Sequence, residues 1–181
     1  MELQNNGLCH GYLPITDWHL QWPLQNSFCP SGIAINQQNH LVIFSRGARE
    51  WKARLAPPYT YIPEKTIFIA DATTGEIISC WGNDLFVMPH GLTVDAANNI
   101  WVTDVELQQV FKFSASGELL MTLGEAGVSG TDAHHFDMPA GVAVAKDGAC
   151  SCAGWGVRMI WTQACGEERG NWPSPSPKAA F

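Results

Sequence analysis

The sequence predicts an all-β protein built from about three four-stranded β-propeller blades, and three observations lead to this prediction. Of its 181 residues 46% are hydrophobic and 15% are charged, with 17 Gly, 11 Pro and 8 Trp. Such a composition suits short strands and tight turns better than long amphipathic helices. A motif of one glycine followed by alternating apolar residues occurs three times. Around it, a four-stranded unit repeats with a period of roughly 50 residues, which is typical of a propeller blade.

The recurring motif supplies the first two strands of each unit. It reads SGIAIN from Ser31, HGLTVD from His90 and AGVAVA from Ala140. Each copy leads through a polar turn into a second run, and the turns are QQNH at 37–40, AANN at 96–99 and KDG at 146–148. Alternating apolar residues indicate strands, and Asn or Asp-Gly between two such runs indicates a hairpin.

Two further strands complete the first and second units. In the second unit these strands are QVFKF at 109–113 and ELLMTL at 118–123, separated by the turn SASG. The first unit has the same pair at 66–70 and 76–81, after an insertion. In both units a glycine closes the fourth strand, which favours a propeller over a plain sandwich of hairpins. The third unit loses the pattern after Gly148, where ACSC is a weak strand.

The expected organisation is an N-terminal extension at 1–25, a partial propeller at 26–172 and a disordered Pro/Ser tail at 173–181. The expected blades cover about 26–83, 84–125 and 134–172. Propellers close with about 4–8 blades, so three blades leave two sheet faces without neighbours. Three interpretations remain open: a fragment of a larger protein, a chain that self-associates through its open blade faces, or a poorly folding product.

Charge and hydropathy exclude some classes of partner. The formal net charge of −7 argues against a generic binder of nucleic acid or anionic membranes. No apolar run approaches the roughly 18 residues that a membrane-spanning helix needs. The first residues, MELQNNGLCHGYLP, lack a basic segment followed by an apolar one, so no signal peptide is visible. We therefore expect a soluble, unanchored chain with no nucleic-acid partner and no membrane span.

The six cysteines are scattered, and only Cys150 and Cys152 lie close together. Alternate residues of one strand point to the same face, where a disulfide is awkward. A metal site would need a second Cys or His pair at ligand spacing, and none stands nearby. Free, partly buried thiols are therefore expected.

The second unit resembles the most characteristic stretch of the peptidyl-α-hydroxyglycine α-amidating lyases. That stretch is FVMPHGLTVDAANNIWVTDVELQQVFKF at 86–113. Residues 31–51, SGIAINQQNHLVIFSRGAREW, resemble the family's earlier blade, and residues 134–144, HHFDMPAGVAV, resemble its next one. The resemblance covers about residues 25–148. It implies a six-bladed NHL-repeat propeller. Family members form the lyase half of peptidylglycine amidating monooxygenase or stand alone, and relatives are often secreted or periplasmic.

The resemblance also implies a reaction and a site. The family splits a peptide that ends in α-hydroxyglycine into a peptide amide and glyoxylate. Its site holds zinc through three His, a catalytic Tyr and Arg, and a structural calcium in the central channel. Zinc can polarise the substrate oxygens, and a base can remove the hydroxyl proton as the C–N bond breaks.

Transferred to this sequence, the family pattern assigns roles to single residues. His90 falls on the first zinc ligand and Arg46 on the catalytic arginine. Ile33 and Leu92 fall on positions that give backbone carbonyls to calcium, an ion that prefers oxygen ligands. Trp155 occupies the position of the family's catalytic Tyr. An indole only donates hydrogen bonds, so Trp155 cannot act as a phenolate base.

Other parts of the family's site have no counterpart. The family's cysteine pair corresponds to Asp137 and Gly156, so that disulfide is absent. The second and third zinc His belong to later blades. His134 and His135 are expected to be loop residues rather than substitute ligands, because adjacent strand residues face opposite ways.

Asp95 and Asp104 could suggest paired catalytic carboxylates. Both lie at the ends of predicted strands, where Asp typically accepts hydrogen bonds from nearby backbone N–H groups. We therefore expect them to cap turns.

Three functional hypotheses remain. The first is an amidating-lyase-like enzyme that uses His90 and Arg46. The second is a non-catalytic NHL-propeller module for binding or assembly. The third is a truncated or frame-disrupted chain, with the break near Gly148. Because the Tyr and two His are missing, we expect negligible lyase activity from this chain alone.

Overall fold

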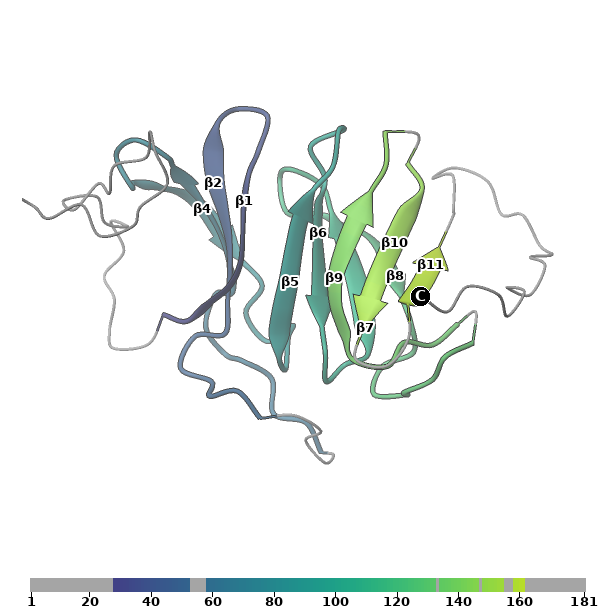
Figure 1. Cartoon of the computed structure of the whole chain (residues 1–181). Coiled ribbons are helices and arrows are strands. Elements are labelled where there is room, and N and C mark those ends of the chain that lie inside the picture. Colours follow the sequence, from purple (N-terminus) through teal and green to yellow (C-terminus); the bar gives the residue numbers. More distant parts are fainter. Residues whose placement is uncertain (1–27, 53–57, 133, 147, 155–157, 162–181) are drawn as a thin grey trace, which may run out of the picture.

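A computed structural model describes residues 28–52, 58–132, 134–146, 148–154 and 158–161 (Figure 1). All regular secondary structure in these ranges is β, arranged in three antiparallel sheets. The prediction of an all-β fold with four-stranded units is confirmed. The expected N-terminal extension (1–25) and tail (173–181) lie outside the described residues. No helix in the described part of the chain is long and apolar enough to cross a membrane.

Each sheet follows chain order from its innermost strand outward. The first sheet contains β1 (Pro30–Ile35), β2 (His40–Ser45), β3 (Ile67–Asp71) and β4 (Ile77–Trp81). The second contains β5 (Pro89–Val94), β6 (Ile100–Asp104), β7 (Gln109–Phe113) and β8 (Leu119–Leu123). The third contains β9 (Pro139–Val144), β10 (Cys150–Gly154) and β11 (Arg158–Trp161). Strands β1, β5 and β9 follow one another across the molecule, β1 beside β5 and β5 beside β9 (Figure 1).

The hairpin at the start of each sheet has the same turn, as the repeat predicts. In the second sheet, the Asp95 N–H donates to the Asn99 carbonyl and the Asn98 N–H donates to the Asp95 carbonyl. The same pair of bonds closes the other two hairpins. The fourth turn residue has positive φ in each, at Asn39 (61°), Asn98 (66°) and Gly148 (86°). Asn and Gly tolerate this conformation better than other residues, which explains why they recur there.

Clusters of buried apolar side chains lie between successive sheets. Between the first and second, Phe86 packs edge-to-face on Phe44 and Phe111, with ring centroids 4.8 and 5.3 Å apart. Between the second and third, buried Trp101 clusters with the thiols Cys150 and Cys152. Burial of these side chains is the main force that holds the sheets face to face.

Glycines at the recurring motif set how closely the inner strands approach. A Cβ added at Gly32 would lie 2.7 Å from Leu92 Cβ, and one added at Gly91 would lie 2.4 Å from the Ala140 carbonyl oxygen. Any larger residue would therefore push β1 from β5, or β5 from β9. A Cβ added at Gly141 would meet nothing within 4 Å among the described residues.

Asp104 is buried at the end of β6, and its carboxylate connects the segment before β5 with the turn after β6. Its Oδ2 accepts the N–H groups of Val87 and Met88 at 2.7 and 2.8 Å. Its Oδ1 accepts those of Glu106 and Leu107 at 3.0 and 2.9 Å. Burial raises the pKa of the Asp104 carboxyl, and the four N–H donors act in the opposite direction. The expected turn-capping role is confirmed, and the same carboxylate also fixes the segment that leads into β5.

Asp95 caps the β5–β6 hairpin, as expected. Its Oδ1 accepts the N–H groups of Ala97 and Asn99, and its Oδ2 accepts the Trp101 indole N–H at 2.9 Å. Burial raises the pKa of Asp95, but hydrogen bonds from Trp101 and Asn99 outweigh it and leave the pKa below its ordinary value. Asp95 and Asp104 are thus occupied by structural hydrogen bonds.

The described cysteines are thiols that form no disulfide, as expected: Cys29, Cys80, Cys150 and Cys152. Cys9 and Cys165 lie outside the described residues. Burial, with a smaller contribution from Cys150, raises the pKa of Cys152 to about 12. Such a thiol is protonated at neutral pH and a poor nucleophile.

Candidate functional site

Three side chains from two sheets meet beside the inner strands: Arg46, Trp51 and His90. Arg46 directly follows β2, and the loop after it carries Trp51. The Arg46 Cζ atom lies 5.4 Å from the centroid of the Trp51 ring. The Trp51 ring also contacts His90: the two ring centroids are 5.3 Å apart, and the ring planes meet at an angle of 65°. The indole is therefore a shared neighbour of the guanidinium and the imidazole. We call these three residues the Arg46–Trp51–His90 cluster.

The backbone positions Arg46 through two hydrogen bonds. Its N–H donates to the Cys29 carbonyl at 2.8 Å, and its own carbonyl accepts the Arg49 N–H at 3.0 Å. The second bond closes a turn just after β2, which helps return the chain toward Trp51. The Arg46 Nε is buried and has no hydrogen-bond partner among the described residues.

The orientation of His90 is fixed by the third sheet. His90 is the second residue of β5, and its Nδ1 lies 2.8 Å from the backbone carbonyl oxygen of Ala140 on β9. A carbonyl only accepts hydrogen bonds, so Nδ1 carries the proton. In the neutral ring, Nε2 then carries the lone pair, the form that binds a metal or accepts a proton.

Ile33 and Leu92 lie on the adjacent inner strands β1 and β5. The close approach of Gly32 to Leu92 holds these two strands together. Two carbonyl oxygens are a small part of the roughly 6–8 oxygen ligands that calcium takes. The described residues therefore do not make up a complete calcium site.

The described residues also lack a complete set of ligands for the zinc that the family resemblance implies. In the described ranges no group of three or more His, Cys, Asp or Glu side chains could hold a metal ion. Catalytic zinc takes about three protein ligands, and His90 offers one. The residues present do not fit a complete zinc site, so we assign no chemical step to that ion.

Asp137, His134 and His135, which are also among the predicted positions, make contacts elsewhere. Trp155 and Gly156 lie outside the described residues. Asp137 accepts a hydrogen bond from the Ser129 hydroxyl at 3.1 Å. His134 and His135 are loop residues before β9, as expected.

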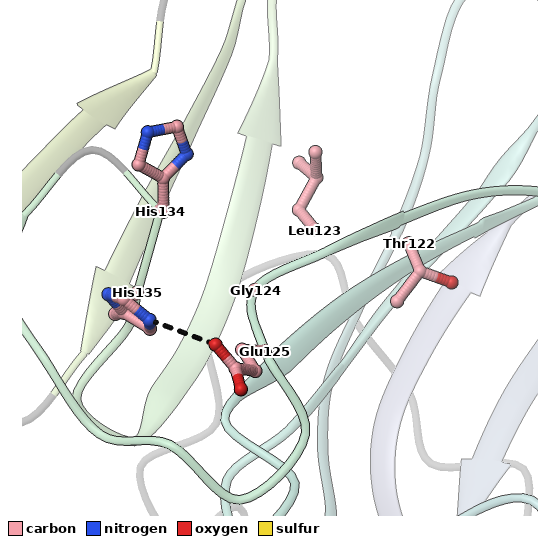
Figure 2. A pocket seen from close by; sticks show the side chains of 6 residues that line it. All are labelled: Thr122, Leu123, Gly124, Glu125, His134 and His135. Carbon is pink, nitrogen blue, oxygen red and sulfur yellow. Dashed lines mark hydrogen bonds and ion pairs between the residues drawn. The ribbon is translucent and has the colours of Figure 1, made fainter.

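His134 and His135 line an open hollow of about 540 Å³ at the end of β8 (Figure 2). The other lining residues are Thr122, Leu123, Gly124 and Glu125. Figure 2 shows His135 pointing toward Glu125, whose Oε2 lies 3.4 Å from Nε2. On the other side of the ring, Nδ1 lies 2.8 Å from Asp132 Oδ1. Both ring nitrogens of His135 thus face carboxylates, which is an ion-pair arrangement rather than a metal site.

The His135 ion pairs predict a pH-dependent loop. The hydrogen bond to Asp132 holds the pKa of His135 above its ordinary value of 6.5, against partial desolvation, with Glu125 contributing. A raised histidine pKa stabilises the fold fully below pH 6.5, and the contribution is lost as pH rises through the folded-state pKa. We expect an NMR titration to place His135 above 6.5 in the wild type and closer to it in Asp132→Asn. Equal pKa values in both proteins would contradict the assignment.

Sequence reasoning missed the part that Trp51 plays in the cluster. Trp51 was visible only as the last residue of the RGAREW segment at 46–51. A large aromatic residue shortly after an arginine at a strand end is a weak signal. Its contact with His90 depends on how the first sheet meets the second.

Comparison with known proteins finds an NHL repeat and similarity to amidating lyases. An NHL repeat model matches residues 86–113. Peptidyl-alpha-hydroxyglycine alpha-amidating lyase 2 of Drosophila melanogaster is 38% identical, over 70% of this chain and 34% of that protein. A probable peptidyl-alpha-hydroxyglycine alpha-amidating lyase of Caenorhabditis elegans is 40% identical, over 65% of this chain and 36% of that protein. Peptidylglycine alpha-amidating monooxygenase of Rattus norvegicus is 42% identical, over 63% of this chain and 13% of that protein.

Among solved structures, a streptogramin B lyase aligns over 72% of this chain and 36% of its own, at 16% identity and a TM-score of 0.49. The chain spans about a third or less of the length of the curated relatives described above. Over most of its own length, the chain is a homologue of the peptidyl-alpha-hydroxyglycine alpha-amidating lyases and carries an NHL repeat.

Proposed function

We propose that the chain provides the carboxylate-binding part of an amidating-lyase site, for peptides that end in α-hydroxyglycine. The observation that carries this proposal is that the Arg46 guanidinium and the His90 imidazole both contact the Trp51 indole. In the family reaction, the C–N bond of the hydroxyglycine breaks and its hydroxyl oxygen becomes the carbonyl of glyoxylate. The hydroxyl proton is removed, and the departing nitrogen gains a proton to become the peptide amide.

Arg46 binds the substrate carboxylate in this proposal. A guanidinium offers a rigid fork of donors that matches a carboxylate in a bidentate way. Substrate and glyoxylate both carry that carboxylate, so the contact orients the reacting carbon rather than selecting the peptide.

His90 is proposed as one ligand of the family's zinc, through Nε2, and the Ile33 and Leu92 carbonyls as ligands of its calcium. The bond from Nδ1 to Ala140 supports the His90 role, because it presents a lone pair on Nε2. Any further ligands would have to come from outside the described residues. Trp155 leaves the catalytic Tyr position without a phenol.

Binding and turnover can be tested separately. We expect hippurate, a carboxylate probe, to bind the wild-type chain in an NMR titration. Arg46→Ala should weaken this binding by at least about tenfold, since a charge-assisted hydrogen bond is lost. Arg46→Lys should recover only part of it, because an ammonium lacks the planar fork. Unchanged affinity in Arg46→Ala would remove Arg46 from the site.

Turnover is measured as glyoxylate released from α-hydroxyhippurate with added zinc. For the chain alone we expect release close to the background rate, because position 155 is an indole and the described residues contain no group of three metal-binding side chains. If release clearly exceeds background, it should disappear in His90→Ala. Release that is unaffected by His90→Ala would exclude His90 from the reaction.

A non-catalytic NHL module is the second candidate. It is favoured by the incomplete set of metal-binding side chains in the described ranges and by the indole at position 155. The two candidates separate in the hippurate titration. A module that has lost the site would show no hippurate binding that depends on Arg46.

A further inference from the structure

We propose that Trp51 is a positioning residue, which holds the Arg46 guanidinium and the His90 imidazole in a fixed relation for a carboxylate ligand. This inference rests on the proposed function of the same cluster. It concerns a residue to which the family resemblance assigned no role. Four observations on the cluster support it.

The first observation is the position of the guanidinium over the Trp51 ring, at 5.4 Å from its centroid. A cation over an aromatic face is attracted by the ring quadrupole, and arginine can do this while its outer N–H groups remain directed elsewhere. The indole can therefore hold Arg46 without competing for the donors that a carboxylate needs.

The second observation is the state of the Arg46 Nε, which is buried without a hydrogen-bond partner among the described residues. The backbone hydrogen bonds to Cys29 and from Arg49 fix the main chain of Arg46. They do not fix the flexible side chain beyond it. Because no hydrogen bond from Nε to the described residues fixes the side chain, we infer that the aromatic contact restricts the direction of the fork.

The third observation concerns His90, whose ring meets Trp51 edge-to-face. The Ala140 carbonyl fixes one ring nitrogen, and the indole packs against the ring. Together these contacts restrict both the tautomer and the tilt of the imidazole. Arg46 and His90, which come from different sheets, are thereby linked through a single side chain.

The fourth observation is that Trp51 is only partly covered, with 38% of its surface exposed. Truncation of such a residue leaves the buried cores between the sheets intact. Its loss should therefore affect the site far more than the fold.

The experiment compares Trp51→Ala and Trp51→Phe with wild type in the hippurate titration. We expect Trp51→Ala to weaken binding by about tenfold, and Trp51→Phe, which keeps an aromatic face, by no more than about threefold. The double variant Arg46→Ala/Trp51→Ala should bind no more weakly than Arg46→Ala, because the indole acts through Arg46. Tyr61→Ala is the matched control, since Tyr61 is 43% exposed in the same inter-strand segment, and it should leave affinity unchanged.

A second measurement needs no ligand. The ring protons of His90 lie near the face or edge of the indole, so their NMR shifts should move in Trp51→Ala and remain closer to wild type in Trp51→Phe. An unchanged His90 spectrum in a folded Trp51→Ala protein would overturn the positioning role.

The two proposals fail in different ways. If Arg46→Ala abolishes hippurate binding and Trp51→Ala leaves it intact, Trp51 has no positioning role and the proposed function stands. If hippurate does not bind the wild type, the proposed function fails. The His90 spectrum then still decides whether Trp51 fixes the imidazole.

Discussion

Replacing Asp104 with alanine is expected to cost the protein at least about 4 kcal/mol of unfolding free energy. The substitution leaves four buried N–H groups without their acceptor, those of Val87, Met88, Glu106 and Leu107. Each unsatisfied buried donor costs about 1–3 kcal/mol. The loss is a large fraction of the roughly 5–15 kcal/mol that stabilises a typical domain. Urea unfolding followed by circular dichroism measures it.

Two further variants locate the cause of the loss. Asp104→Asn keeps one oxygen and should cost less than alanine, although its NH₂ group would face two backbone donors. Asp95→Ala removes a carboxylate that also accepts backbone N–H groups, but at a partly exposed hairpin. It should cost clearly less than Asp104→Ala, because water can replace the lost acceptor. Similar losses at both positions would show that burial at Asp104 is not the reason.

Replacing Gly91 with alanine is expected to cost about 1–3 kcal/mol, the usual range for overpacking. The added Cβ would lie 2.4 Å from the Ala140 carbonyl oxygen and 2.8 Å from the Gly141 Cα. Both are backbone atoms, so β5 and β9 must move apart to admit the methyl group. The same movement would lengthen the hydrogen bond from His90 to Ala140. Urea unfolding and the His90 NMR signals report the two effects together.

Gly141→Ala provides the control in the same motif. A Cβ there meets no described atom within 4 Å. We expect no loss, or a small gain of up to about 1 kcal/mol, because alanine restricts the unfolded chain. A cost equal to that of Gly91→Ala would mean that another element covers β9 on this side.

The fold could be predicted from sequence because its signals are local. The turn residues Asn39, Asn98 and Gly148 adopt positive φ where the repeat places Asn or Gly. Gly82 and Gly124, which close the fourth strands, also have positive φ, at 89° each. Local backbone requirements of this kind restrict which residue can occupy the position, so they can be recognised in the sequence.

The site could be predicted only in part. The motif around His90 and Arg46 suggested that both belong to one site, but the Trp51 contact depends on the distance between β1 and β5. That distance is set by a tertiary fit, the approach of Gly32 to Leu92. In the same way, the sequence placed His135 in a loop but gave no sign of its pairing with both Asp132 and Glu125. Contacts between residues that are distant in the chain or lie across a loop do not produce a repeating pattern in the sequence.

Because His90 of the second repeat forms a hydrogen bond with the Ala140 carbonyl of the third, the third repeat determines how this imidazole is oriented. A graft of the second repeat alone into a foreign scaffold would carry the imidazole but lose the carbonyl that sets its tautomer. Transplantation of this site therefore requires adjacent repeats to be moved as a pair.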